Sequence, residues 1–139
     1  MEPLLALAVV AALVAGATVL GLLWNAGQGR VRHGGRAETV FIDGVELGAG
    51  VTLLQFSSEY CAPCRSTARV LESLAHDDER LTHVELDVAE RPELAARFGI
   101  LQTPTTLVLD GSGRIRARIG GVVRRDHLTA ELAKLTVAA

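Results

Sequence analysis

This chain of 139 residues has no long run of like charges, no internal repeat and few cysteines. The formal net charge is −2 and no long run of one sign occurs, which argues against a nucleic-acid-binding surface. No internal repeat is found, so this length favours a single domain. Only two cysteines are present, Cys61 and Cys64, and both fall in the short segment EYCAPC. A C-x-x-C pair serves as a redox dithiol, as half of a metal site or as a small structural disulfide.

Charge is absent from the N-terminal segment. Residues Pro3 to Trp24 carry no charged side chain over 22 positions, and at about 1.5 Å per residue this length matches a hydrocarbon layer of about 30 Å. A transmembrane anchor in contact with membrane lipid is therefore predicted over residues 1–24. A signal peptide is disfavoured because the n-region is only Met-Glu and the apolar run is long. A buried helix is disfavoured because a remaining domain of about 100 residues is too small to enclose a helix that is apolar on all sides.

Residues 25–37 are rich in Gly and Arg and show no hydrophobic period, which predicts a juxtamembrane linker. This segment contains Arg30, Arg32 and Arg36, whereas the other side of the apolar run offers only the α-amine and Glu2. The positive-inside rule therefore predicts a single-pass membrane protein with its domain on the cytoplasmic side. The extracytoplasmic side is the alternative.

The remaining residues, 38–139, are predicted to form one α/β domain. Strands are predicted at residues 39–42, 51–58, 83–88, 105–110 and 114–119. A helix is predicted after the cysteines, a second after Pro92 and a third over 125–135. The first helix has an apolar face composed of Ala68, Leu71, Leu74 and Ala75. A βαβ unit followed by a ββα unit predicts an α/β sandwich with a central mixed sheet and helices on both faces.

The cysteines are predicted to lie where a central strand ends and a helix begins. A helix N-terminus presents unpaired N–H groups and about half a positive charge, which stabilises a thiolate. Cys61 precedes the predicted helix and Cys64 lies one turn inside it. This placement predicts an exposed attacking Cys61 and a more buried resolving Cys64, with Pro63 stiffening the turn.

The two other uses of the cysteine pair fit less well. A zinc finger of two cysteines and two histidines has a gap of about 12 to 15 residues, then histidines separated by about three to five. Here 11 residues separate Cys64 from His76, and six separate His76 from His83. A structural disulfide would close a very small loop, and the cytoplasm would reduce it. A redox dithiol is therefore preferred, and neither a metal nor a bound cofactor is predicted.

Two stretches resemble the thioredoxin family in register, FSSEYCAPCRSTARVLESLA and ELDVAERPELAARFGILQTPTTLVLDGSGRIRARIGG. The resemblance extends over nearly all of residues 38–136. It rests on the strand before C-x-x-C, the LDVAERPELAARFGI segment, Thr103-Pro104-Thr105 and the Gly pair after the hairpin. The resemblance implies a thiol:disulfide oxidoreductase whose partners are protein disulfide substrates and a thioredoxin reductase or another thiol electron donor.

The resemblance also implies roles for individual residues. Pro104 is the counterpart of the family's cis-proline beside the cysteine pair, and the backbone at Thr103 is expected to pair with an extended substrate. Tyr60, Ala62 and Pro63 complete the expected substrate-binding surface. Tyr60 replaces the usual tryptophan, and simple packing explains it equally well.

Gln55 is the largest departure from the family pattern. Thioredoxins usually carry a buried aspartate six residues before the first cysteine, and it handles the proton of the resolving cysteine. Gln55 cannot titrate, although it can form hydrogen bonds or orient a water. Glu85 falls where the family often has the lysine partner of that aspartate. Gln55 and Glu85 are therefore candidates for a proton relay, with a solvent-facing Glu85 as the alternative.

The preferred function is a membrane-anchored thioredoxin-like reductase of protein disulfides. One alternative is an extracytoplasmic exchange protein that serves exported thiols or cytochrome maturation. Another is a binding module that keeps the fold but does not catalyse disulfide exchange.

Overall fold

The structure is a computed structural model that describes residues 2–27, 29, 31–33 and 39–137. Its elements are, in order, α1 (Glu2–Gly27), β1 (Val31–His33), β2 (Val51–Ser57), α2 (Ala62–Asp77), β3 (Leu81–Asp87), α3 (Pro92–Arg97), β4 (Thr105–Leu109), β5 (Ile115–Gly120) and α4 (Arg125–Val137). The predicted helices and the four longer strands are thus confirmed, with ends shifted by at most three residues.

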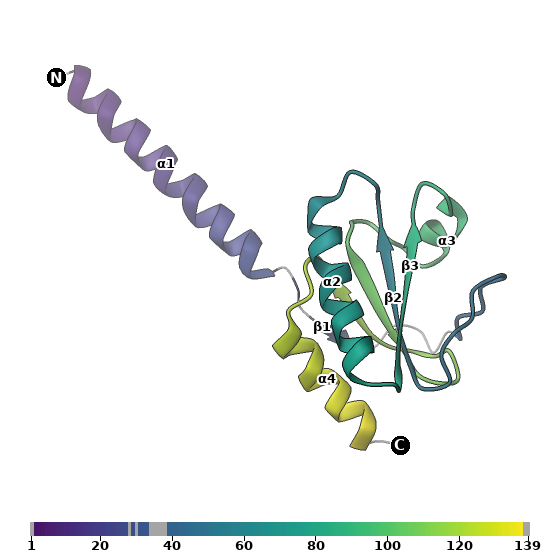
Figure 1. Ribbon diagram of the computed structural model, residues 1–139. Coiled ribbons are helices and arrows are strands. Elements are labelled where there is room, and N and C mark those ends of the chain that lie inside the picture. Colours follow the sequence, from purple (N-terminus) through teal and green to yellow (C-terminus); the bar gives the residue numbers. More distant parts are fainter. Residues whose placement is uncertain (1, 28, 30, 34–38, 138–139) are drawn as a thin grey trace.

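The five strands form one mixed sheet in the order β1-β5-β4-β2-β3. Strand β2 pairs with β3 in parallel and with β4 antiparallel, and β4 and β1 each pair antiparallel with β5. The parallel pair is the βαβ unit, because α2 crosses over between its strands. Figure 1 shows α2 and α4 on one face of the sheet and α3 on the other, which confirms the predicted α/β sandwich.

Strand β2 lies in the interior of the sheet and supplies both halves of the core. Leu54 and Phe56 pack with Leu94 and Phe98 on the α3 face. On the opposite face Leu53 packs with apolar residues from both larger helices, Leu71, Leu74 and Leu128. Because side chains alternate along a strand, Gln55 shares the second face with Leu53 and points toward α2.

The segment predicted as a strand over 39–42 does not form one. Thr39 makes only an isolated bridge to Arg114, although Val40 and Ile42 are buried in the core on the α3 face. The strand that extends the sheet beside β5 is β1, which pairs with Ala117–Ile119, and residues 39–42 contribute apolar side chains to the core without forming a strand.

Strand β1 falls within the stretch that was predicted to be a linker. The α1 helix continues to Gly27, and Val31–His33 pairs with Ala117–Ile119 of β5. Three residues surrounded by Gly and Arg are too few to show an alternating pattern, which explains why this strand was not predicted. The boundaries 1–24, 25–37 and 38–139 remain predictions, and residues 28, 30 and 34–38 lie outside the described part of the chain.

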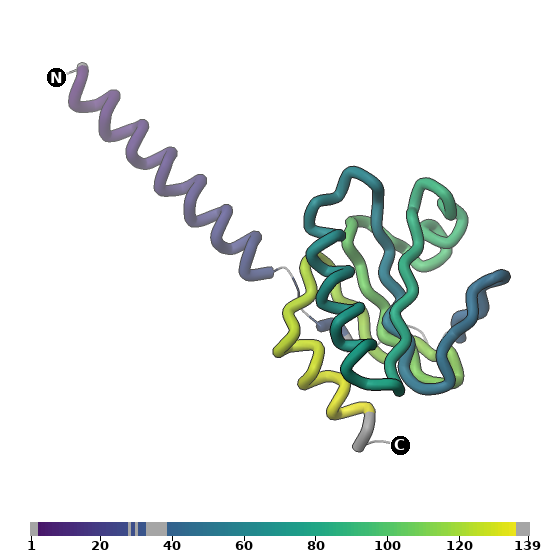
Figure 2. Tube along the Cα trace, in the orientation of Figure 1, coloured from purple at the N-terminus to yellow at the C-terminus, as the bar shows by residue number. Residues whose placement is uncertain are grey.

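Helix α1 extends away from the sheet as a single straight rod (Figures 1 and 2). Pro3–Gly27 has a mean hydropathy of 2.5 over its most apolar window, and no part of that window is buried. Its length and composition are those of a membrane span, and a signal sequence has the same properties.

Candidate active site

The turn between β2 and α2 places both cysteines at a helix N-terminus. Cys61 is the residue that caps α2, with extended backbone at φ −91° and ψ 97°. Its Sγ accepts a hydrogen bond of 3.2 Å from the backbone N–H of Cys64. This N–H lies in the first turn of the helix and also donates to the Cys61 carbonyl at 3.1 Å, so the turn supplies a shared donor for negative charge on Cys61 Sγ.

The two cysteines form a disulfide with an S–S distance of 2.13 Å and a Cα–Cα distance of 5.2 Å. Their exposure differs, because Cys61 is half-buried at the start of the helix while Cys64 is only 2% exposed. This difference in exposure agrees with the predicted placement of an outer and an inner cysteine.

The segment before β4 lies beside the cysteine turn. The Thr103-Pro104 peptide bond is cis, as the resemblance implied, and Pro104 is buried. The hydroxyls of Ser58 and Thr103 are 3.5 Å apart, and Ser58 also accepts a backbone hydrogen bond from Cys61. Residues far apart in the sequence thereby meet at one end of the sheet.

Exposed apolar side chains lie close in sequence to the cysteines and to Thr103. Tyr60 is 91% exposed, which disfavours the interpretation that it only packs, and Ala62 and Pro63 are also exposed. Leu101, two residues before Thr103, is 96% exposed and was not identified from the sequence. An apolar residue two positions before the Thr-Pro segment was the available signal. Such side chains suit contact with a protein surface.

Gln55 lies beneath the cysteine turn and is fully buried. Its Nε2 donates a 3.0 Å hydrogen bond to the backbone carbonyl of Cys64. Its Oε1 lies 3.1 Å from Nε2 of His83 on β3. The sequence identified Gln55 but considered His83 only as a zinc ligand, so this second partner was missed. The signal was the position of His83, two residues before Glu85 on the same face of the strand.

Glu85 lies opposite Gln55 in the register of β2 and β3, but its side chain is exposed. The polar atoms of Gln55 are hydrogen-bonded to Cys64 and His83. Burial lowers the pKa of His83, while the nearby carboxylates of Glu85 and Glu72 oppose that shift. Glu85 therefore acts electrostatically on His83, and a role for it in proton transfer remains a prediction.

The remaining polar group beside Gln55 is a hydroxyl. Thr106 lies directly opposite Gln55 in the register of β2 and β4. Its Oγ1 is buried and has no hydrogen-bond partner within the described part of the protein. No cluster of three or more His, Cys, Asp or Glu side chains that could hold a metal occurs among the described residues.

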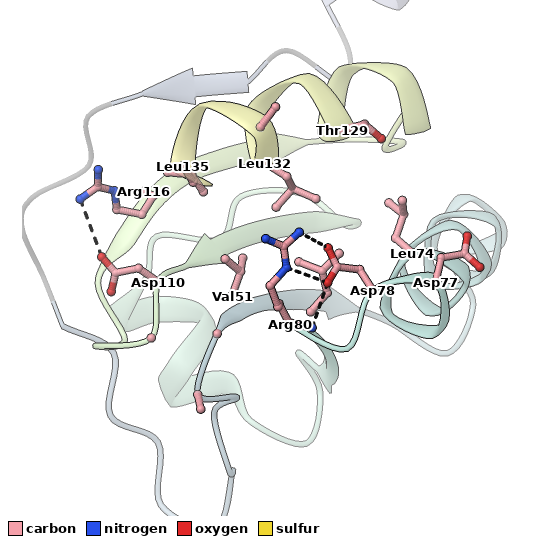
Figure 3. Close-up of a pocket in the computed structure, with 15 residues that line it drawn as sticks. Val51, Leu74, Asp77, Asp78, Arg80, Asp110, Arg116, Thr129, Leu132 and Leu135 are labelled. Atoms are coloured by element: carbon pink, nitrogen blue, oxygen red, sulfur yellow. Dashed lines mark hydrogen bonds and ion pairs between the residues drawn. The ribbon is translucent and has the colours of Figure 1, made fainter. Parts of the chain in front are cut away.

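A pocket of about 730 Å³ lies away from the cysteines. It is lined by Val51, the first residue of β2, whereas the cysteine turn follows the last residue of that strand. Figure 3 shows its rim, where Arg80 pairs with Asp78 and Arg116 with Asp110. The hydrogen bonds from Arg80 lower the pKa of Asp78 to about 2. These charges pair with each other, and the pocket lies at the opposite end of β2 from the cysteine turn.

Residues 36–134 match the sequence model of the family described as Thioredoxin. A thioredoxin from Staphylococcus saprophyticus is 41% identical over 89 residues, which are 63% of this chain and 85% of the relative. A thioredoxin from Chlamydia muridarum is 33% identical over 88 residues, again covering 63% and 85% of the two chains.

Solved structures show the same fold. Chloroplastic thioredoxin z superimposes with a TM-score of 0.58 at 25% identity, covering 64% of this chain and 80% of the other. The germline-specific thioredoxin Deadhead of Drosophila melanogaster superimposes with a TM-score of 0.54 at 26% identity, covering 63% and 82%.

Proposed function

This chain belongs to the thioredoxin family and is a thiol:disulfide oxidoreductase with a Cys61–Cys64 pair, and we propose that it is a membrane-anchored reductase of protein disulfides. The observation that carries the proposal is the unequal environment of the two sulfurs. Cys61 caps a helix and is partly exposed, whereas Cys64 is buried behind it. One cysteine is thus accessible to a substrate, and the other is accessible mainly to its neighbour.

The reaction begins with both cysteines reduced. The Cys61 thiolate attacks one sulfur of the substrate disulfide, so that a mixed disulfide forms and the first substrate thiolate leaves. The Cys64 thiolate then attacks Cys61 Sγ, which closes the protein disulfide and releases the second substrate thiolate. The substrate gains two electrons, the protein dithiol loses two, and the two cysteine protons end on the released thiols through solvent.

Substrate recognition is proposed to use the surface around the cysteine turn. The exposed Tyr60, Ala62, Pro63 and Leu101 offer apolar contact, and the backbone at Thr103 offers strand-like hydrogen bonds to an extended segment. Backbone recognition reads few side chains of the substrate, so a broad range of protein disulfides is expected. A thioredoxin reductase or another thiol donor would return the protein to its dithiol form.

Membrane anchoring is proposed for α1. Its apolar side chains are exposed, and contact with lipid would remove them from water. Arg30, Arg32 and Arg36 follow the helix, and positive charge beside a span favours the cytoplasmic side. A reducing compartment also favours net reduction of substrates. The extracytoplasmic side, with service to exported thiols or cytochrome maturation, is the alternative placement.

Insulin reduction tests the activity. The detergent-solubilised full-length protein should accelerate the precipitation of insulin chains when dithiothreitol is present, and it should not turn over without a reductant. The Cys61→Ser variant is the matched control and should give only the background rate. A wild-type rate equal to that background would favour the alternative of a binding module that keeps the fold but performs no exchange.

A further inference from the structure

The orientation of the Gln55 side chain follows from its hydrogen bonds. The carbonyl of Cys64 can only accept, so the amide nitrogen of Gln55 must face it at 3.0 Å. The amide oxygen then faces Nε2 of His83 at 3.1 Å. An amide oxygen can only accept, and His83 Nε2 must therefore carry a proton. Neutral His83 is thus the Nε2–H tautomer, and its Nδ1 is the atom that gains a proton on acidification.

The hydrogen bond to Gln55 survives this titration, because Nε2–H is present in both the neutral and the charged imidazole. What changes is the charge on the His83 imidazole. Glu85 on β3 and Glu72 on helix α2 both stabilise the charged imidazolium. Partial burial acts in the opposite sense and lowers the pKa of His83 below its usual range.

Neither of the other polar side chains beneath the turn can titrate in this range. Gln55 and Thr106 lie in register across β2 and β4, and both are neutral. The backbone of Cys64 is therefore connected by hydrogen bonds, through one neutral amide, to a single titratable group, His83.

We propose that His83 is a positioning residue for the dithiol: it holds the Gln55 amide against the Cys64 carbonyl, and its protonated form favours the Cys64 thiolate. The inference rests on the proposed function and assigns a residue that governs its second step. No proton passes from Cys64 to His83 through these hydrogen bonds, because Gln55 cannot accept one. The Cys64 proton goes to solvent, and the imidazolium lowers the free energy of the thiolate that remains.

This role changes the pH dependence of resolution in a defined way. The rate at which Cys64 attacks the mixed disulfide follows its thiolate fraction, which falls about tenfold per pH unit below the thiol pKa. Once His83 is protonated, the imidazolium raises the fraction of Cys64 that is thiolate. The rate of resolution then lies above the line extrapolated from higher pH. For partly screened charges that are linked through the Gln55 amide and the Cys64 backbone, we expect an excess of about three- to tenfold.

Stopped-flow reaction of the reduced full-length protein with a chromogenic aromatic disulfide separates the two steps. Attack by Cys61 releases the first coloured thiol and resolution by Cys64 releases the second. The second phase is recorded from about pH 5 to about pH 9, the range that contains histidine titration. Wild-type protein should show the acid-side excess.

Two variants separate the charge from the hydrogen bond. His83→Gln can keep a donor toward Gln55 but cannot titrate, so it should retain the wild-type rate at high pH and lose the acid-side excess. His83→Leu removes both and should also slow resolution at high pH, because Gln55 loses the partner that orients it. An excess that persists in His83→Gln would overturn the electrostatic role. Equal high-pH rates in His83→Leu and His83→Gln would overturn the positioning role.

Nuclear magnetic resonance of the imidazole nitrogens in the oxidised protein tests the geometry without turnover. The expected result is the Nε2–H tautomer above the pKa of His83. The Nδ1–H tautomer would overturn the inference even if the protein reduces insulin. If the Nε2–H tautomer is found but wild-type protein releases no coloured thiol, the proposed function itself is wrong.

Discussion

Replacing Gln55 by glutamate should make stability depend on pH in a way that identifies its hydrogen bonds. Glutamate has nearly the same shape, but an ionised carboxylate cannot donate to the Cys64 carbonyl that Gln55 contacts at 3.0 Å. Only the protonated acid can donate there, and the site is fully buried. Burial and the lost donor therefore raise the pKa of the new carboxyl in the folded protein, while the His83 partner limits the rise.

A raised folded-state pKa determines the direction in which the stability of the variant changes with pH. The contribution of the protonated acid is fully present below the unfolded pKa of glutamate, about 4.3, and is lost as the pH rises through the folded value. A shift of about one to two units corresponds to roughly 1.4 to 2.7 kcal/mol. The Gln55→Glu variant should thus approach wild-type stability near pH 4 and fall below it by about this amount at neutral pH.

Urea denaturation of both proteins at several pH values measures the difference. Gln55→Leu is the matched control, since it removes both hydrogen bonds without adding a titratable group. Its loss should be about 1 to 3 kcal/mol and should vary little with pH apart from the titration of His83. A Gln55→Glu variant as stable as wild type at neutral pH, or one that gains on wild type as the pH rises, would refute the assigned hydrogen bonds.

Three further outcomes are expected. Gln55→Asp should speed resolution of the mixed disulfide near neutral pH in stopped-flow measurements, provided that the acid is hydrated enough to ionise. An unchanged or slower rate would mean that water or another group already carries the proton. Tyr60→Ala or Leu101→Ala should raise KM for insulin by about tenfold while leaving reaction with the small aromatic disulfide unchanged, and equal effects on both would contradict a docking role. A fluorescent protein fused after Ala139 should mature while a fused alkaline phosphatase stays inactive; phosphatase activity without fluorescence would place the domain on the extracytoplasmic side.

The fold was largely predictable because its main signals are local. The alternating and apolar patterns of the longer strands, the helix face around Leu71 and the hairpin glycine Gly113, which has φ 77°, each determine one element. Position in the sheet was not predictable for the short segments. Residues 31–33 pair with Ala117–Ile119 of β5 while Thr39 makes only an isolated bridge to Arg114, and no local pattern records which short segment extends the sheet.

Some features of the candidate site were also predictable from local sequence, and others were not. Helix capping by Cys61 and burial of Cys64 follow from their places at the strand-to-helix turn. The contact between Gln55 and His83 joins residues that lie 28 positions apart, and it depends on the parallel register of β2 and β3. Sequence reasoning placed both residues on strands, but it could not say which side chains on neighbouring strands would meet.

The unequal roles of the two cysteines are the central claim. Their most direct test is trapping on non-reducing gels, with protein substrates captured by Cys64→Ser and by Cys61→Ser. Cys64→Ser should accumulate mixed disulfides, because the exposed Cys61 can still attack but nothing resolves the product. Cys61→Ser should accumulate none, because its remaining sulfur is buried. Equal trapping by the two variants would contradict the assignment of attacker and resolver.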